Sequence, residues 1–167
     1  MTLSSDSWST PSGGLLSLCQ HDPRNPELVQ FAYTPDSIWR NRDTFLQGRD
    51  AIVEFLRNKW AKEGDYRLRK ELFAFTDNKV CCLLTSLLRA GTDSSIAPQI
   101  AVQFWYEWKD ETGQWWRTYG LEDWTFAENG LMRKRQMSGN DVKIEDGERW
   151  FKGGVDVDAV EISERHW

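Results

Sequence analysis

The stretch from Ile100 to Gln136 constrains the fold most, because it predicts three consecutive β-strands. The runs IAVQFWYEW, QWWRTYGLEDWTFA and GLMRKRQ are separated by short segments rich in Asp, Asn and Gly. Asp, Asn and Gly adopt the backbone angles of tight turns, whereas Trp, Tyr, Phe, Val and Thr favour strands. Five of the ten tryptophans lie here, interleaved with Glu and Arg. We therefore expect an antiparallel meander with one face lining a partly wet pocket.

The length and charge of the chain exclude several classes of partner. At 167 residues the chain is expected to form one domain with an ordinary core. A net charge of -5 argues against nucleic acid, because phosphate binding needs a basic surface. No apolar run reaches the roughly 20 residues that span a bilayer, and the N-terminus lacks the apolar core of a secretory signal. A cytoplasmic location is expected.

Metal, cofactor and nucleophile motifs are not found in the sequence. Cys19, Cys81 and Cys82 form neither a disulfide framework nor a C-x-x-C motif, and His21 and His166 lie near the termini. A zinc site is therefore not expected. There is no G-x-S-x-G motif, phosphate-binding loop or dinucleotide fingerprint. Any chemistry is expected to need no cofactor.

Helices and two further strands flank the meander. A short helix is expected from Pro26 to Tyr33, and a longer amphipathic helix from Ala51 to about Glu63. Segments 37–41 and 65–76 are expected as strands, the second because apolar and charged residues alternate. This order predicts an α+β fold with helices packed on one face of a curved, mostly antiparallel sheet.

The remaining segments are expected to lie outside this pattern. Residues 1–24, rich in Ser, Thr, Gly and Pro, predict a disordered or weakly helical lead. The chain is expected to leave the sheet over 138–146 and to end in a loose acidic tail, 147–167. Residues 80–99 interrupt what would otherwise be a direct junction between a turn at Asn78-Lys79 and the strand that begins at Ile100. Val80-Cys81 at the start of the segment and Gln99 at its end can be encoded by the nucleotide sequences that border a fungal-type intron. We hypothesise a translated retained intron or a loop insertion there; a mature transcript without these codons would confirm the first. The domain itself is expected over 25–146.

Glu122 is the first candidate for proton transfer. Strand alternation places it on one face with Trp116 and Trp124. A carboxylate between two indoles would be desolvated, which raises its pKa toward the range of a general acid or base. The alternative is a structural ion pair with Arg133 or Arg135 on the neighbouring strand.

Tyr106 and a group of arginines complete the candidate site. Tyr106 could donate to a developing enolate oxygen, or it could pack with its hydroxyl at the pocket rim. Arg133 and Arg135 are expected to share a face and, with Trp39 and Arg42, to hold a carboxylate or phenolate. The alternative for the arginines is a lattice of structural salt bridges.

The chain also resembles the DUF1348 family. The resemblance is carried by AYTPDSIWRNR (32–42), the GRD-initiated helix (48–60), DYRLRKELFAF (65–75), FWYEWKDETGQWWRTYG (104–120) and GLMRKRQMSGNDV (130–142). That family belongs to the nuclear transport factor 2-like (NTF2-like) superfamily, with SnoaL-type polyketide cyclases, ketosteroid isomerases and scytalone dehydratases as distant relatives.

The resemblance implies a cone-shaped α+β barrel and a homodimer formed through the sheet. It does not imply one reaction. The leading hypothesis is a cofactor-independent SnoaL-like isomerase, cyclase or dehydratase for a small aromatic or polyketide-like carbonyl compound, and fungal secondary metabolism is the expected setting if residues 80–99 are a retained intron. In this hypothesis the proton is moved by Glu122, the enolate is stabilised by Tyr106 and Arg135, and the pocket is shaped by Trp39, Trp116 and Trp124. The alternative is a non-catalytic ligand-binding or scaffold protein, because the superfold hosts both kinds.

Three departures from the family pattern bear on the pocket. The long first helix of the family is not recognisable before Asp22, the 80–99 segment is foreign to it, and Leu121 stands where a polar residue is expected. A missing first helix would uncover one wall of the cone. An aberrant gene model with an impaired product is the third interpretation.

Overall fold

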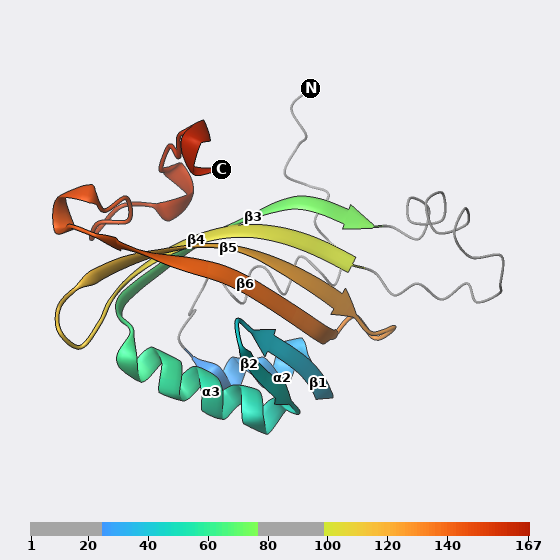
Figure 1. The fold of residues 1–167 in the computed structure, drawn as a ribbon. Coiled ribbons are helices and arrows are strands. Elements are labelled where there is room, and N and C mark those ends of the chain that lie inside the picture. Colours follow the sequence, from blue (N-terminus) through green and yellow to red (C-terminus); the bar gives the residue numbers. More distant parts are fainter. Residues whose placement is uncertain (1–24, 77–98) are drawn as a thin grey trace.

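The computed structural model describes residues 25–76 and 99–167, which form one curved sheet with helices against one face (Figure 1). Residues 1–24, for which a disordered or weakly helical lead is expected, and all but the last residue of the 80–99 segment lie outside the described residues. In chain order the elements are η1 (Pro26–Leu28), α2 (Val29–Ala32), β1 (Tyr33–Asn41), β2 (Thr44–Gln47), α3 (Arg49–Lys62), β3 (Gly64–Thr76), β4 (Gln99–Lys109), β5 (Trp115–Phe126), β6 (Met132–Ile144), η2 (Asp146–Glu148), η3 (Val157–Ala159) and η4 (Glu164–His166).

The predicted meander is confirmed. The six strands lie in the order β2-β1-β6-β5-β4-β3, and every neighbouring pair is antiparallel except β1 and β6. Gly113 and Gly130, in the two turns of the meander, have φ angles of 87° and 79°, which glycine adopts without strain. The sheet is curved (Figure 1). It does not close into a barrel, because β2 and β3 form two separate edges. The α+β prediction is therefore confirmed.

Two details of the sheet differ from expectation. β2 was not predicted, because its four residues are too few to show a pattern. β6 stays paired with β5 as far as Ile144, opposite Trp115, so the expectation that residues 138–146 leave the sheet is wrong. The Ser-Gly-Asn sequence there resembles a turn, but the ladder continues through it, with Gly120 opposite Gly139.

Helix α3 covers the concave face of the sheet (Figure 1). Ile52 and Leu56 are buried there with Trp39, while Val53 and Trp60 are partly buried beside them, as the amphipathic pattern predicts. The helix begins at Arg49, after Gly48 with its φ of 86°, two residues earlier than expected. None of the helices in the described residues combines the length and apolar character needed to cross a membrane.

The C-terminal segment, residues 146–167, packs on the opposite face of the sheet from α3 (Figure 1). Phe151 is fully buried against Trp105, and Ile162 is buried with them. The expectation of a loose tail is therefore wrong. The apolar residues of this segment are too irregularly spaced to show a periodic pattern.

A close contact between strands yields the first prediction. Phe104 lies opposite Gly120, and a Cβ added at Gly120 would meet the Phe104 ring at 2.0 Å. Phe104 is almost completely buried, so its ring has little room to move. We expect Gly120→Ala to lower the free energy of unfolding by about 1–3 kcal/mol, as overpacking does, measured by urea denaturation.

Gly139→Ala is the matched control on the next strand, because its Cβ would lie 3.1 Å from the nearest atom, a methyl group of Thr118. We expect a smaller loss from it. Equal losses from the two variants would contradict a specific clash with Phe104.

Candidate functional site

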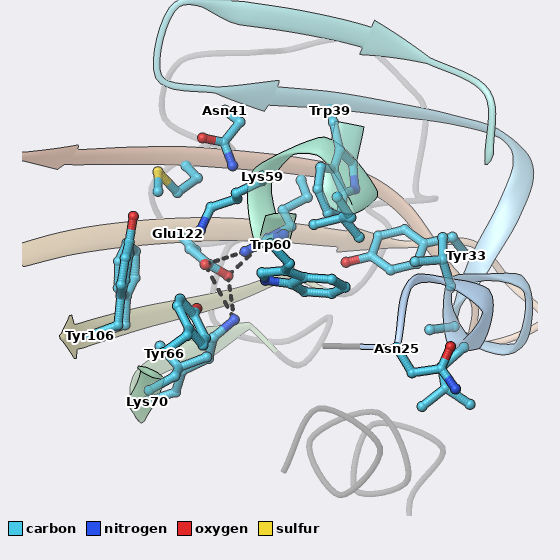
Figure 2. A pocket seen from close by; sticks show the side chains of 18 residues that line it. Asn25, Tyr33, Trp39, Asn41, Lys59, Trp60, Tyr66, Lys70, Tyr106 and Glu122 are labelled. Carbon is cyan, nitrogen blue, oxygen red and sulfur yellow. Dashed lines mark hydrogen bonds and ion pairs between the residues drawn. The ribbon is translucent and has the colours of Figure 1, made fainter. Parts of the chain in front are cut away.

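A cavity of about 110 Å³ lies between the concave face of the sheet and the helices (Figure 2). An engineered apolar cavity of about 150 Å³ accepts benzene, so this space suits a ligand of about one ring. Most of its wall is apolar, with Trp39, Trp60 and Phe104 as the largest side chains. The polar side chains that line it are Asn25, Tyr33, Asn41, Lys59, Tyr66, Lys70, Tyr106, Glu122 and Arg135.

Glu122 lies at the centre of a charged cluster on this wall (Figure 2). Its carboxylate accepts hydrogen bonds from Lys70 Nζ at 3.1 and 3.2 Å, from Arg135 Nε at 3.0 Å and from Trp124 Nε1 at 2.6 Å. Burial by itself would raise the pKa of Glu122, but the charges of Arg135 and Lys70, together with the hydrogen bonds, lower the pKa to about 2. Glu122 is therefore held as an anion at neutral pH.

The expected rise in the pKa of Glu122 is therefore wrong. Alternation along β5 correctly predicted that Trp124 lies beside the carboxylate. The indole does more than exclude water, however, because its N–H donates a hydrogen bond to Glu122 that lowers the pKa. Lys70 reaches Glu122 from β3, two strands away in the sheet. The alternative weighed from the sequence, an ion pair with Arg135, is the arrangement that forms.

Arg133 is diverted from the cavity. The β5–β6 register changes between Thr125, opposite Lys134, and Phe126, opposite Met132, so Arg133 is the extra residue of a β-bulge. Its guanidinium donates to the Asp36 carbonyl oxygen at 3.2 Å and pairs with the Asp36 carboxylate. The prediction that Arg133 and Arg135 face the pocket together is therefore wrong.

Only one of the three predicted pocket tryptophans lines the cavity. Trp39 is buried in the wall, and the guanidinium of Arg135 lies 4.4 Å from the centre of its ring. Trp124 lies behind Glu122. Trp116 stacks on Trp108 with ring centres 6.0 Å apart and donates to Asp110 near the β4–β5 turn.

Tyr106 lines the cavity, and its hydroxyl oxygen is contacted by Arg42 from outside the cavity. The Arg42 guanidinium donates to the Tyr106 hydroxyl oxygen at 3.4 Å and also binds Asp141 and the Gly139 carbonyl oxygen. Burial, aided by the charge of Glu63, raises the pKa of Tyr106 to about 12. The phenol therefore keeps its proton at neutral pH and is able to donate a hydrogen bond to a ligand. Arg42 contacts Tyr106 and is not part of the cavity wall.

Lys59 and Lys70 were missed from the sequence, although each carries a signal. Lys59 lies three residues after Leu56, on the buried stripe of α3. Lys70 shares the alternation of Tyr66 and Leu68 in β3. A cation on an apolar face is a rare arrangement, and here both lysines line the cavity. Asn41 and Tyr66, which also line it, carry no comparable signal.

Solved structures that resemble this chain share its fold at low sequence identity. A hexachlorocyclohexane dehydrochlorinase of type 2 aligns with a TM-score of 0.62 at 10% identity, covering 84% of this chain and 90% of that one. A candidate scytalone dehydratase from Novosphingobium aromaticivorans aligns with a TM-score of 0.60 at 10% identity, covering 81% and 86%. An NTF2-like protein of unknown function from Burkholderia pseudomallei aligns with a TM-score of 0.56 at 17% identity, covering 78% and 92%. The fold is therefore NTF2-like.

A family assignment comes from sequence comparison. No curated protein matches the chain. The family described as "Protein of unknown function (DUF1348)" matches residues 19–86 and 88–152. The match covers the 80–99 segment except for Leu87, so it does not support the expectation that this segment is foreign to the family. The insertion or intron hypothesis stays a prediction. Since the matched residues make up most of the sequence, the chain belongs to the DUF1348 family.

Proposed function

We propose that this chain is a cofactor-independent enzyme that isomerises, cyclises or dehydrates a single-ring carbonyl compound. The observation that carries the proposal is the cavity, in which a protonated tyrosine and several basic side chains converge on a mostly apolar space of about one-ring size. A polyketide-like substrate and a setting in secondary metabolism stay predictions.

Electrostatics supports an oxyanion in this cavity. Its wall holds three basic side chains, Lys59, Lys70 and Arg135, and one carboxylate, Glu122. Positive charge therefore remains in excess even when Glu63, the partner of Lys59, is counted. Donors fixed in a site that excludes bulk water stabilise the negative charge that develops when a carbonyl compound loses a proton. Tyr106 is the neutral donor of this set, and Arg135 the charged one.

Glu122 takes a different role from the one expected. With a pKa of about 2 and hydrogen bonds from three side chains, it is too weak a base to remove a proton from carbon. We assign to Glu122 the role of holding the side chains of Arg135 and Lys70 in position at the cavity wall. Trp39 then supports the guanidinium of Arg135 from its ring face.

The similar structures support the reaction class. Two of them are named for eliminations, a dehydrochlorinase and a candidate dehydratase. Eliminations and enolisations both remove a proton from carbon, which fits a cavity whose donors would stabilise the negative charge that develops.

The test uses acetophenone and 4-hydroxyacetophenone, which are single-ring ketones with exchangeable methyl protons. We expect each to raise the melting temperature of the protein, and the protein to accelerate hydrogen–deuterium exchange of the methyl group, followed by NMR in D2O. Tyr106→Phe should slow this exchange about 100-fold or more, the usual cost of one oxyanion donor.

Tyr119→Phe is the matched control, because Tyr119 lies on the opposite face of the sheet with its hydroxyl 2.8 Å from His166. This variant should exchange at the wild-type rate. The absence of both binding and exchange with the wild-type protein would sink the proposed function.

A non-catalytic binding protein is the second candidate. The observation that favours it is the fully engaged Glu122, since no other carboxylate lines the cavity among the described residues. In that case the ketones would bind without any acceleration of exchange.

We also propose that the protein forms a homodimer through the outer face of the sheet. Phe73, Leu121 and Val142 line a shallow hollow on this face and are 57%, 53% and 46% exposed. Exposed apolar side chains gathered on one face are typical of association surfaces. Leu121 occupies this outer face, so its apolar character has no effect on the cavity. Light scattering that gives the mass of one chain would contradict the dimer.

A further inference from the structure

A second hollow, a groove of about 660 Å³, adjoins the cavity. Asn41, Lys59 and Tyr106 line both spaces, whereas Glu63 and Arg42 line the groove alone. The side chains of Lys59 and Tyr106 therefore lie between the cavity and the more open groove. A proton that crosses this wall between cavity and solvent would meet these groups.

We propose that Lys59 is the catalytic base and acid of the cavity, and that Glu63 is a positioning residue which exchanges protons between Lys59 and the groove. The assignment rests on the proposed function and names its proton-transfer group. It replaces Glu122, whose lone pairs are occupied by Lys70, Arg135 and Trp124.

The geometry of α3 holds this pair in place. Lys59 and Glu63 are four residues apart at the end of the helix and form an ion pair, and their side chains are 14% and 11% exposed. The Lys59 Nζ lies 4.8 Å from the ring centre of Tyr66 and 4.6 Å from that of Tyr106. The amino group therefore lies over the two tyrosine rings, and one of these rings, Tyr106, carries the hydroxyl that would bind the carbonyl oxygen.

Burial favours the neutral state of the pair. It lowers the pKa of Lys59, against the attraction of Glu63, and raises the pKa of Glu63, against the attraction of Lys59. The other groups that act on the pair, or lie beside it, are Arg42, Tyr66, Tyr106, Arg135 and Asp141. In the neutral state the amine carries a lone pair and the carboxyl group carries the proton.

The reaction step conserves atoms and electrons. The Lys59 amine takes a proton from the carbon next to the carbonyl, so that a C–H bond breaks and an N–H bond forms. The bonding electrons move to the carbonyl oxygen, and the enolate oxygen accepts a hydrogen bond from Tyr106. The Lys59 ammonium then returns a proton to carbon, at the same or a conjugated position, and the amine is restored. No oxidant or reductant takes part.

The test compares Lys59→Met with Lys62→Met, both in the full chain. Lys62 is exposed on the same helix, and Met has a helix propensity close to that of Lys. With acetophenone as the probe, we expect Lys59→Met to slow methyl exchange about 100-fold or more, the usual contribution of a general base. The melting-temperature shift caused by acetophenone should persist in this variant, and Lys62→Met should exchange at the wild-type rate.

Glu63→Gln supplies a readout that a structural role would not move. Removing Glu63 removes the charge that raises the pKa of Lys59. The rate of exchange rises with pH as the amine loses its proton, so this rise should shift to lower pH in the variant. The test remains available if Lys59→Met fails to fold.

Two outcomes would overturn the assignment. One is an exchange rate in folded Lys59→Met close to that of the wild type, and the other is an unchanged pH profile in Glu63→Gln. In both outcomes the wild-type protein still binds acetophenone and accelerates exchange of its methyl protons. If the proposed function itself is wrong, the wild-type protein neither binds acetophenone nor accelerates this exchange.

Discussion

Glu122→Gln is expected to lower the free energy of unfolding by roughly 3–5 kcal/mol at pH 7. Removing one partner of a buried ion pair leaves the other charge without compensation, and that is the usual cost. Here the substitution affects both Arg135 and Lys70, whose side chains are 14% and 12% exposed. Urea denaturation of the wild type and the variant measures the loss.

The pH dependence of this loss follows from the lowered pKa of Glu122. Its pKa falls from 4.5 to about 2 on folding, so its contribution to stability is complete above about pH 4.5 and is lost as the pH falls toward 2. The difference between wild type and variant should therefore shrink in acid. Glu128→Gln, an exposed position in the β5–β6 turn, is the control and should cost little at either pH.

The same variant separates the two roles considered for Glu122. A large loss of stability fits the anchoring role. A variant that keeps its stability would contradict the anchoring role.

The sequence predicted the meander and its faces because strand alternation is a local property. The turns at Gly113 and Gly130 fix the register of β4, β5 and β6, and once the register is fixed every side chain has a known face. Glu122 and Tyr106, both predicted as site residues, line the cavity, although alternation alone did not decide which face of the sheet lines it. Alternation fails only where the ladder is irregular, as at Arg133, and a bulge leaves no clear mark in the sequence.

Electrostatic pairing was harder to predict because it joins distant segments. The pKa of Glu122 depends on Lys70, 52 positions away in sequence, and the neighbours of Lys59 come from β3 and β4. The sequence does mark these lysines as cations on apolar faces. It does not specify which carboxylate each cation meets, since this depends on how α3 lies across the sheet.

The C-terminal segment illustrates a third difficulty. Its short turns have no periodicity, and its acidic composition resembles that of a solvated tail. Its attachment depends on a carboxylate of β4 that points away from the cavity. Glu107 is fully buried and accepts hydrogen bonds from the backbone N–H groups of Trp150 and Phe151. The acceptor and its donors are separated by more than 40 positions, so no local pattern shows the contact.

Glu107→Ala is expected to release this segment and to lower the free energy of unfolding by roughly 3–5 kcal/mol, the cost of breaking a buried ion pair. Its partner Arg117 donates to the Glu107 carboxylate at 2.9 and 2.6 Å and lies 3.4 Å from the ring centre of Trp150. In the variant Arg117 remains buried without its carboxylate, and the N–H groups of Trp150 and Phe151 lose their acceptor. Trypsin should then cleave faster at the exposed Lys152, because cleavage follows local opening.

Glu161→Ala is the matched control, since Glu161 is an exposed carboxylate within the same segment; it should change neither stability nor cleavage. The cavity lies on the other face of the sheet, so the melting-temperature shift caused by acetophenone should survive in Glu107→Ala if the meander stays folded. Replacing Glu107 and Arg117 together with Met should recover part of the stability, because no charge is then left buried. Wild-type cleavage rates in Glu107→Ala would mean that the apolar contacts of Phe151 and Ile162 hold the segment without the carboxylate.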